Sequence, residues 1–254
     1  MSSFKDTYGP WAIVTGASSG IGVEFARQLA AKGLNLILIA RRKDRLDALA
    51  EELSGKHQIT VKTLEVDLGA SDFLEKVREG TDGLEVGLLV NNAGVAVNGP
   101  LHKPDLEKQL QMLHVNCTAP MVLAHEFANQ MIARQKGGII FTASVSSFFP
   151  VPYVGHYAAT KAYGLFLAAS LNYELRKDNI HVQAICPGYT ESEMTEKVRA
   201  KKMSAQAVVE ESLDKLGRKS VVIAGLKNKL MVWFMTKFFS TEALARLGGR
   251  MMEK

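Results

Sequence analysis

The chain has 254 residues, a formal net charge of +5 at pH 7 and 47% hydrophobic residues, values that are ordinary for a globular protein of one or two domains. Its first residues, MSSFKDTYGPWAIVTG, contain no apolar run, so we expect no signal peptide, and no stretch reaches the roughly 18–20 apolar residues of a membrane span. Cys117 and Cys186 stand among apolar neighbours, so we expect two buried thiols rather than a disulfide framework.

The positive charge is concentrated towards the C-terminus. Residues 197–254 contain 13 Lys and Arg against 5 Asp and Glu, whereas the other 196 residues contain 18 against 21. Such asymmetry can mark a surface for an anionic partner, and it can equally arise from solvated helix faces. The sequence leaves both interpretations open, and we expect no nucleic-acid partner.

Short apolar runs rich in β-branched residues alternate along the chain with segments of helical periodicity. Continuous Val, Ile and Leu runs separated by helices are typical of a parallel sheet that is covered on both faces. We therefore expect the α/β class, with residues 1–254 forming a single doubly wound Rossmann-type domain whose seven-stranded parallel sheet carries helices on both faces. The expected strands are 11–15, 34–40, 60–66, 87–91, 138–143, 180–186 and 219–224.

A glycine-rich turn follows the first expected strand and precedes a helix, which predicts a phosphate site. Glycines let the backbone approach a pyrophosphate, and a helix N-terminus supplies free N–H groups and positive potential. The spacing is G-x-x-x-G-x-G rather than the general dinucleotide pattern G-x-G-x-x-G, so a purely structural tight turn is the alternative. The residues of this turn are Gly16, Ser18, Ser19, Gly20, Ile21 and Gly22.

Two arginines, Arg41 and Arg42, follow the second expected strand, 19 and 20 residues after Gly22. An acidic residue at this place would bind the ribose 2′-hydroxyl of NAD, whereas an arginine accommodates the 2′-phosphate of NADP. A planar guanidinium suits phosphate oxygens. The arginines therefore favour NADP(H) over NAD(H), against the alternative of a solvated basic start to the next helix.

Four motifs in order resemble the short-chain dehydrogenase/reductase family over nearly the whole chain. They are TGASSGIG from Thr15, NNAG at residues 91–94, YAATK at residues 157–161 and Pro187-Gly188. The resemblance implies a nicotinamide-dependent oxidoreductase that moves a hydride to or from a carbonyl or hydroxyl carbon.

The resemblance also implies further site residues. Asp67 and Leu68 would hold the adenine, Asn92, Ala93 and Gly94 would lie along the cofactor, and Thr190 would meet the nicotinamide amide through its backbone. Ser192 stands where the family commonly has Thr, which leaves open whether that side-chain contact is kept. The implied catalytic set is Asn116, Ser144, Tyr157 and Lys161, with Tyr157, Lys161, Pro187 and Gly188 also touching the cofactor.

The spacing Y-x-x-x-K occurs twice, at Tyr157 with Lys161 and at Tyr173 with Lys177. Either pair could share a helix face, but only Tyr157 opens a helix of small residues shortly after Ser144, so we expect Tyr173 to lie on the surface. A nearby ammonium, aided by oxidised nicotinamide, would lower the pKa of Tyr157 towards the working pH.

The other catalytic-set members also have residue-level interpretations. Ser144 would hydrogen-bond the substrate oxygen as negative charge develops on it. By the resemblance, Asn116 would support Lys161 through a proton-carrying water. Asn116 could also fix a break in the long helical pattern near Pro120, which we expect to kink or divide that helix.

The substrate side is less defined. The apolar loop 146–153 would either wall a hydrophobic pocket or pack against a neighbouring helix, and the polar segment 189–217 is expected to form a mobile substrate lid. Lipid-like ketones, 3-oxoacyl thioesters, steroids and small carbonyls remain open. A non-catalytic NADP(H) sensor and a sugar-nucleotide epimerase or dehydratase are the alternatives; the first should lack part of the Ser–Tyr–Lys set and the second should need more chain.

The C-terminal segment 226–254 is both basic and apolar. Ser240 is expected to cap a second helix within it. Apolar residues nearly all round the first helix favour burial on the sheet, closure of the substrate pocket or a dimer contact. Lysines beside Trp and Phe fit the alternative of a helix on an anionic membrane surface. We expect a cytoplasmic homodimer or homotetramer, with peripheral membrane contact as that alternative.

Overall fold

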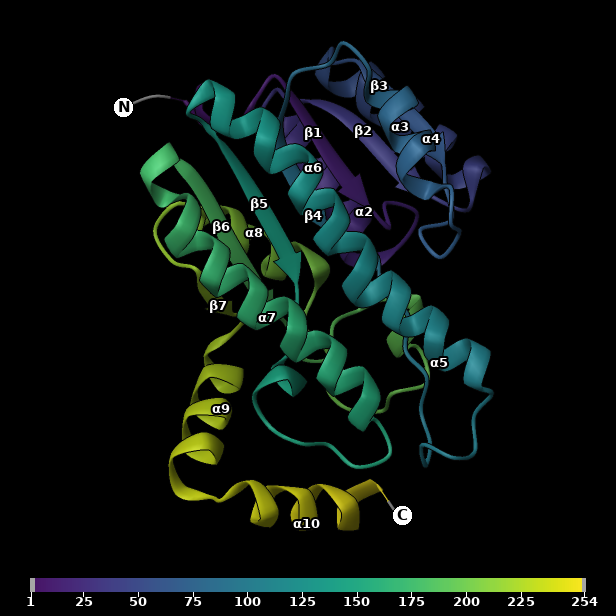
Figure 1. The fold of residues 1–254 in the computed structure, drawn as a ribbon, viewed down its shortest axis with the longest axis vertical. Helices are drawn as coiled ribbons and strands as arrows, with labels where there is room; N and C mark the ends of the chain where they lie inside the picture. Colours follow the sequence, from purple (N-terminus) through teal and green to yellow (C-terminus); the bar gives the residue numbers. More distant parts are fainter. Residues whose placement is uncertain (1–2, 253–254) are drawn as a thin grey trace.

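The computed structural model describes residues 3–252, which form one seven-stranded, all-parallel sheet with the order β3-β2-β1-β4-β5-β6-β7 (Figure 1). The expected α/β fold is therefore confirmed. The last strand is shorter than the expected range 219–224. Ser220 lies outside it, although its carbonyl still accepts a hydrogen bond from the N–H of Ala184. The strands are β1 (Trp11–Thr15), β2 (Asn35–Ala40), β3 (Val61–Glu65), β4 (Val86–Asn91), β5 (Gly137–Thr142), β6 (Ile180–Cys186) and β7 (Val221–Ile223).

Ten α-helices within residues 3–252 surround the sheet. Short 3-10 or π turns, described where they matter, separate some of them. The helices are α1 (Phe4–Tyr8), α2 (Gly20–Ala31), α3 (Lys43–His57), α4 (Phe73–Thr81), α5 (Leu106–Leu113), α6 (Ala119–Arg134), α7 (Gly155–Leu175), α8 (Ala205–Lys215), α9 (Leu226–Phe238) and α10 (Thr241–Met252).

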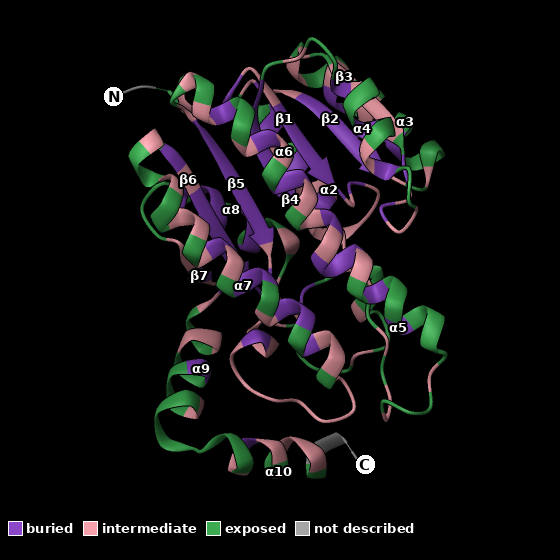
Figure 2. Cartoon of the chain, in the orientation of Figure 1, coloured by how far each residue is buried: buried purple, intermediate pink, exposed green. Residues whose placement is uncertain are grey.

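Two apolar cores lie on opposite faces of the sheet (Figure 2). Alternate residues of one strand point to opposite faces, so in β1 Val14 joins the core beneath α2, α3 and α8, while Ile13 joins the core beneath α4, α6 and α7. Because both faces are covered, every residue of β4 is buried. This explains why the central strands read as continuous apolar runs.

The long helical pattern is divided just before Pro120, as expected. A π-helical turn, η1 (His114–Thr118), separates α5 from α6. Pro120 lies in the first turn of α6, where the lack of a backbone N–H is tolerated. Asn91 Nδ2 at the end of β4 donates to the carbonyl of Pro120 at 3.2 Å. The π turn holds Asn116 in a buried position.

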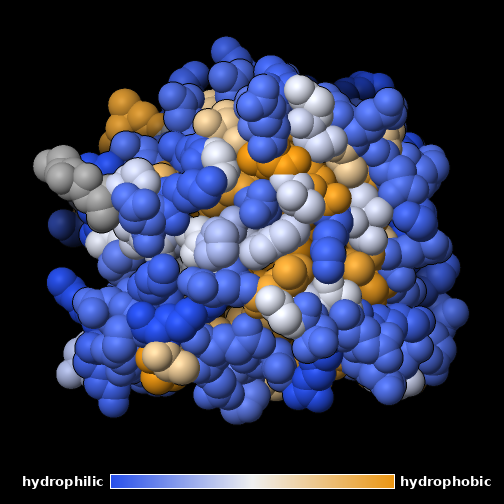
Figure 3. Space-filling view, turned by 90° about the horizontal axis from the view of Figure 1, so that it is seen from above, coloured by the Kyte–Doolittle hydropathy of each residue, from blue (hydrophilic) through white to orange (hydrophobic). Residues whose placement is uncertain are grey.

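All strands run in one direction, so their carboxyl ends meet at one edge of the sheet, the edge that faces α9 and α10 in Figure 1. In a doubly wound sheet the ligand lies beyond this edge. Figure 3 shows the opposite end, where a mostly hydrophilic rim surrounds a central apolar area.

Helices α9 and α10 extend from the body of the protein beyond the carboxyl edge (Figure 1). Three packed arrangements were expected for this segment, and one of them, burial on the sheet, is not seen for α9, where only Val232 is buried. Ser240 begins α10 as expected, with its Oγ accepting from the N–H of Ala243 at 3.2 Å. Within residues 3–252 no helix combines the length and the apolar character that a bilayer span requires.

Candidate active site

The carboxyl ends of the strands open into one continuous cleft, and the structure places most of the predicted site residues on its walls. Two predicted residues, Gly22 and Asn116, lie behind this lining. The predicted residues that line the cleft are Gly16, Ser18, Ser19, Gly20, Ile21, Arg41, Arg42, Asp67, Leu68, Asn92, Ala93, Gly94, Ser144, Tyr157, Lys161, Pro187, Gly188, Thr190 and Ser192.

The turn between β1 and α2 forms a close backbone cradle. Gly16 and Gly20 have φ angles of +66° and +54°, in the left-handed region that favours glycine. A Cβ atom on Gly22 would lie only 2.2 Å from the carbonyl oxygen of Gly16. Ser19 precedes α2 without a side-chain cap, so its hydroxyl leaves the first N–H groups of the helix free for an anion. The turn therefore fits the phosphates of a dinucleotide.

Arg41 and Arg42 have different surroundings at the end of β2. Arg42 Nη2 donates to Ser18 Oγ at 3.0 Å, and Arg42 Nη1 pairs with Glu193 at 2.7 Å. The same carboxylate pairs with Arg45, and these bonds hold the pKa of Glu193 below its usual range. Arg41 is exposed and forms no hydrogen bond or ion pair with the rest of residues 3–252, so its guanidinium is available to an anion in the cleft.

Asn92 joins the glycine turn to the end of β4. Its side chain donates to the carbonyl of Thr15 at 2.9 Å, and its backbone N–H donates to Thr15 Oγ1 at 2.9 Å. Thr142 at the end of β5 donates to Asn92 Oδ1 at 3.4 Å. These bonds hold the floor of the cleft in place between three neighbouring strands.

Ser144, Tyr157 and Lys161 come together in the cleft. Ser144 lies between β5 and the 3-10 turn η2 (Val145–Phe148), and it is hydrogen-bonded to the phenol of Tyr157 in the first turn of α7. Lys161 lies one turn further along α7, with its Nζ 5.8 Å from the centroid of the Tyr157 ring. That Nζ donates to the carbonyl of Thr142 at 2.8 Å, and the lysine is only 7% exposed.

Burial dominates the pKa values of this group. It raises the pKa of Tyr157, which the hydrogen bond from Ser144 partly offsets, and it lowers the pKa of Lys161 to about 8 against the opposing thiols of Cys117 and Cys186. The chain alone thus does not lower the pKa of Tyr157 as the sequence led us to expect. Oxidised nicotinamide, the second source of positive charge in that expectation, is not part of the chain.

Asn116 lies directly behind the catalytic group. Its Nδ2 donates to the carbonyl of Val95 at 2.9 Å and to Thr160 Oγ1 at 3.0 Å, while its Oδ1 accepts from the N–H of Val95 at 2.9 Å. A Cβ on Gly94 would lie 3.1 Å from Lys161 Nζ and 3.4 Å from Asn116 Oδ1. The two side chains therefore flank Gly94, which is compatible with both interpretations of Asn116, namely support of the lysine and fixing of the helix break.

The two thiols lie close to this group and are buried. Cys117 and Cys186 are both free within the described chain, as expected. Burial raises the pKa of Cys186 to about 12. Both cysteines are therefore protonated, apolar neighbours of Lys161 at neutral pH.

The segment 189–217, expected to form a substrate lid, is held at its start by backbone hydrogen bonds. The N–H of Glu191 donates to the carbonyl of Met203, and the N–H of Met203 donates to the carbonyl of Tyr189, each at 2.9 Å. A Cβ on Gly20 would lie 2.9 Å from the Cβ of Ser192, so the strap 191–202 starts against the glycine turn. The later part of the segment forms α8, which buries Val208 and other residues in the core beneath α2.

The apolar loop 146–153 packs against a neighbouring helix, which was one of its two expected roles. It does not contribute to the cleft lining. Instead it packs against α10, where a Cβ on Gly248 would lie 3.1 Å from Pro152 Cδ. Apolar residues that the sequence did not single out also line the cleft, among them Val95, Ala143 and Met194.

Three polar contacts in the site were missed from the sequence. Thr15 lies inside the TGASSGIG motif, so its motif position could have indicated it. The carbonyl of Thr142 has no sequence signal, because any residue supplies one, and Glu193 meets Arg42 across 151 residues. Tyr173 is 87% exposed, far along α7 from the cleft, as the choice between the two Y-x-x-x-K pairs predicted.

Comparisons with known proteins agree with this geometry. The family model described as short chain dehydrogenase matches residues 10–203. Very-long-chain 3-oxoacyl-CoA reductase-A of Danio rerio is 34% identical, over 96% of this chain and 78% of the relative. Very-long-chain 3-oxoacyl-CoA reductase of Homo sapiens is 32% identical, over 88% of this chain and 73% of the relative.

Solved structures give the same result. A structure of 7beta-hydroxysteroid dehydrogenase superimposes with a TM-score of 0.92 at 25% identity, covering 98% of this chain and 100% of that one. A short-chain dehydrogenase from Sphingobium yanoikuyae in complex with NADPH superimposes with a TM-score of 0.82 at 31% identity, covering 91% and 97%. This chain therefore belongs to the short chain dehydrogenase family and is an oxidoreductase that acts on CH–OH groups with a nicotinamide cofactor.

Proposed function

We propose that this protein is an NADP(H)-dependent reductase or dehydrogenase of a hydrophobic carbonyl–alcohol pair, with Tyr157 as the proton donor or acceptor. The observation that carries the proposal is the meeting of Ser144, Tyr157 and Lys161 in the cleft beside a fitted phosphate cradle. A non-catalytic sensor is disfavoured because that set is complete. The nicotinamide would supply or accept the hydride.

The chain's own residues would perform the remaining steps. Ser144 holds the substrate oxygen near the Tyr157 hydroxyl, which gives its proton to that oxygen during reduction and takes one from the alcohol during oxidation. Lys161, kept in position by its bond to the carbonyl of Thr142, provides positive charge beneath the ring. Asn116 acts as a positioning residue through Val95 and Thr160.

The cofactor would lie between the glycine turn and the strap 191–202. Ser18, Arg41 and Arg42 would hold the 2′-phosphate of NADP(H), Asp67 and Leu68 would flank the adenine, and Thr190 would meet the nicotinamide amide. The exposed, unpaired guanidinium of Arg41 supports the choice of NADP(H), since a phosphate dianion is a strong acceptor for it.

The substrate class is proposed from three observations. Val95, Ala143 and Met194 give the cleft an apolar wall. The relatives in Danio rerio and Homo sapiens are named very-long-chain 3-oxoacyl-CoA reductases. A long-chain 3-oxoacyl thioester is therefore the first candidate. A hydroxysteroid–oxosteroid pair is the second, because the structure of a 7beta-hydroxysteroid dehydrogenase superimposes with a TM-score of 0.92. A homodimer or homotetramer and a cytoplasmic location remain predictions.

The test combines a substrate panel with a cofactor variant. Purified protein is mixed with NADPH or NADH and with 3-oxoacyl thioesters of increasing chain length, oxosteroids and small ketones, and the loss of nicotinamide absorbance is followed. We expect faster turnover with NADPH and with the long-chain thioesters. Equal rates for small and long carbonyls would contradict the hydrophobic substrate.

Arg41→Asp tests the cofactor assignment. Loss of a charge-assisted bond to phosphate is expected to raise the Kd for NADPH by a factor on the order of 10–100, corresponding to about 1.5–3 kcal/mol, with a much smaller effect on NADH. The matched control is Arg218→Asp, since Arg218 is an exposed arginine that pairs with Asp214 away from the cleft. Equal losses of NADPH and NADH affinity in Arg41→Asp would overturn the 2′-phosphate assignment.

A further inference from the structure

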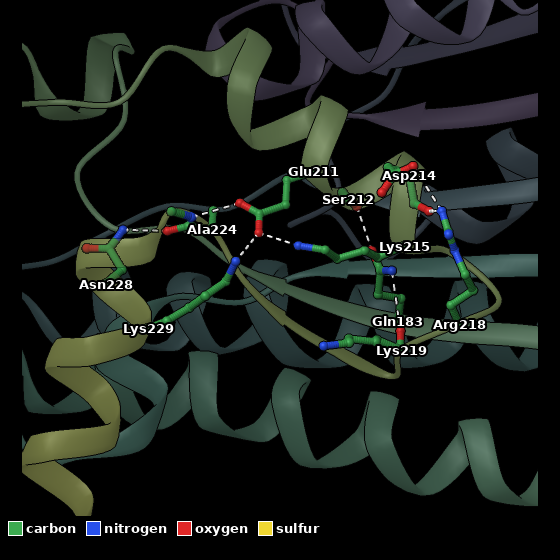
Figure 4. Close-up of polar contacts among 11 residues, drawn as sticks. Gln183, Glu211, Ser212, Asp214, Lys215, Arg218, Lys219, Ala224, Asn228 and Lys229 are labelled. Atoms are coloured by element: carbon green, nitrogen blue, oxygen red, sulfur yellow. Dashed lines mark hydrogen bonds and ion pairs between the residues drawn. The ribbon is translucent and has the colours of Figure 1, made fainter.

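The described part of the C-terminal arm, residues 226–250, is fixed at its base rather than loosely attached. Figure 4 shows the carboxylate of Glu211 on α8 between Lys215 and Lys229 of α9, with the N–H of Gly225 donating to it at 2.8 Å. Asn228 Nδ2 donates to the carbonyl of Ala224 at 2.7 Å. The arm therefore presents a fixed surface to its surroundings.

Aromatic side chains gather on the free side of this arm. Trp233 and Phe234 each contact Phe238, with ring centroids 5.6 and 5.1 Å apart, and Phe234 also contacts Phe239 at 5.7 Å. Trp233 is 54% exposed and Phe238 is 58% exposed although they touch each other. Leu226 and Leu230 extend the exposed apolar side towards the start of α9. Clustered exposed apolar groups of this kind mark an interaction surface.

Basic side chains surround the aromatic cluster. Lys237 Nζ lies 5.3 Å from the centroid of the Trp233 ring. Lys227, Lys237, Arg246 and Arg250 are exposed, and none of them forms an ion pair within the described chain. The one acidic residue of segment 226–250 is Glu242. The free surface of the arm is therefore cationic around an aromatic centre.

We infer that this surface docks onto an anionic lipid membrane. Aromatic rings and leucines enter the boundary between headgroups and acyl chains, while lysines and arginines face the anionic headgroups. A second copy packed arm against arm fits less well, because that contact would bring two cationic surfaces together. Closure of the cofactor cleft also fits less well, because no residue of 226–250 lines that cleft.

This inference concerns a surface outside the catalytic group and does not depend on the proposed substrate or cofactor. The expected binding is reversible, since an interfacial helix with a few basic residues gives far weaker attachment than a membrane-spanning segment. Each basic residue held near an anionic surface contributes about a fivefold increase in partition coefficient at physiological ionic strength. The attraction falls as salt screens the charges.

Flotation of the full-length protein with liposomes tests the inference. The liposomes contain phosphatidylcholine alone or phosphatidylcholine with about 30 mol% phosphatidylserine, in about 0.05 M or about 0.5 M NaCl. We expect flotation with the anionic liposomes at low salt and a loss of flotation at high salt. Protein that stays in the dense fraction with anionic liposomes at low salt overturns the inference.

Two double variants separate the contributions of the cluster. Phe234→Ser with Phe238→Ser removes exposed rings, and Lys227→Glu with Lys237→Glu reverses exposed charges; each is expected to lower the partition coefficient at least about tenfold. The matched controls are Tyr173→Ser and Lys56→Glu with Lys177→Glu, exposed positions on other elements, which should bind as the wild type does. Circular dichroism melting confirms that each variant is folded.

The contrary outcomes are specific. Equal loss of binding in the arm variants and in the control variants would show that overall charge, not the arm, attracts the liposomes, and the inference would fail. Conversion of an oligomer to a monomer by Phe234→Ser with Phe238→Ser, measured by light scattering and without liposome binding by the wild type, would assign the surface to a second copy instead.

Discussion

At the scale of single residues, the proposed proton transfer depends on Tyr157, which lies among ionisable side chains whose charged forms are disfavoured by burial. Burial raises the pKa of Tyr157 and lowers that of Lys161 to about 8. The neutral phenol is therefore the stable form at pH 7, ready to donate a proton to a carbonyl oxygen. In the oxidative direction the phenolate needs extra positive charge, which oxidised nicotinamide would add.

Tyr157→Phe is expected to reduce kcat at least about 100-fold while the fold and cofactor binding persist, because it removes only the hydroxyl. Steady-state kinetics and a cofactor fluorescence titration measure the two effects. Tyr173→Phe is the control, since Tyr173 has the same motif spacing but is 87% exposed. A damaging Tyr173→Phe beside a harmless Tyr157→Phe would reverse the assignment.

The residues of the candidate site were predictable from the sequence where a motif position names the side chain. Ser144, Tyr157 and Lys161 could be named because each belongs to a motif position, and the structure brings them together. The contact of Lys161 with the carbonyl of Thr142 could not be predicted, since it depends on where β5 ends relative to α7. The pairing of Glu193 with Arg42 and Arg45 could not be predicted because it joins distant segments.

At the scale of elements, the turn between β1 and α2 has no room for a side chain at Gly22, where the start of the helix approaches the backbone of Gly16. A Cβ on Gly22 would lie 2.2 Å from the Gly16 carbonyl oxygen, a backbone atom that cannot rotate away. Gly22→Ala is therefore expected to lower the free energy of unfolding by about 2 kcal/mol or more and to abolish cofactor binding. Urea denaturation and a cofactor titration measure these losses.

Gly55→Ala provides the matched control for that substitution. Gly55 lies in α3, and a Cβ there would have no neighbour within 4 Å. Replacing a helical glycine by alanine at such a position is expected to stabilise the protein by about 0.4–1 kcal/mol. Similar destabilisation by both substitutions would contradict the argument from close approach.

Strands were predictable to within a few residues because burial on both faces leaves apolar runs that only a covered parallel sheet accommodates. The π turn at His114–Thr118 was not predictable, since an extra residue in a helical turn leaves no periodicity of its own. The position of α9 stayed open for a related reason: apolar residues all round a helix indicate a partner but do not identify it as the sheet, the substrate pocket, a second copy or a membrane.

At the scale of the whole molecule, the burial of Lys161 makes stability depend on pH. The unfolded lysine titrates near 10.5 and the folded one near 8, so between these values the unfolded chain binds a proton that the folded chain lacks. The free energy of unfolding therefore rises with pH across this window by about 3 kcal/mol from this group.

Lys161→Met removes that contribution. We compare the free energies of unfolding of variant and wild type by urea denaturation. The value for the variant minus the value for the wild type is expected to fall by about 3 kcal/mol between about pH 7.5 and about pH 10.5, because only the wild type gains stability from Lys161 across this range. Cys186, whose pKa burial raises to about 12 and the charge of Lys161 lowers, destabilises both proteins as pH rises, and somewhat more so the variant, so its contribution has the same sign as the expected change. A pH-independent difference would show that Lys161 is charged in the folded protein throughout this range.

The bridge from Glu193 to Arg42 and Arg45 joins the strap 191–202 to the start of α3, and Arg42, Ser192 and Met194 all border the cleft. A dinucleotide bound as proposed would lie beneath this bridge and would leave only after the ion pairs open, so the bridge would act on the residence time of the cofactor rather than on its contacts. The side chains of Glu193, Arg42 and Arg45 are all partly exposed to solvent, so each ion pair contributes little free energy and opens often. Glu193→Gln should therefore raise the cofactor dissociation rate in stopped-flow measurements by about two- to fivefold. Glu196→Gln changes an exposed carboxylate three residues further along the same strap that forms no ion pair within the described residues, and it should leave the release rate unchanged.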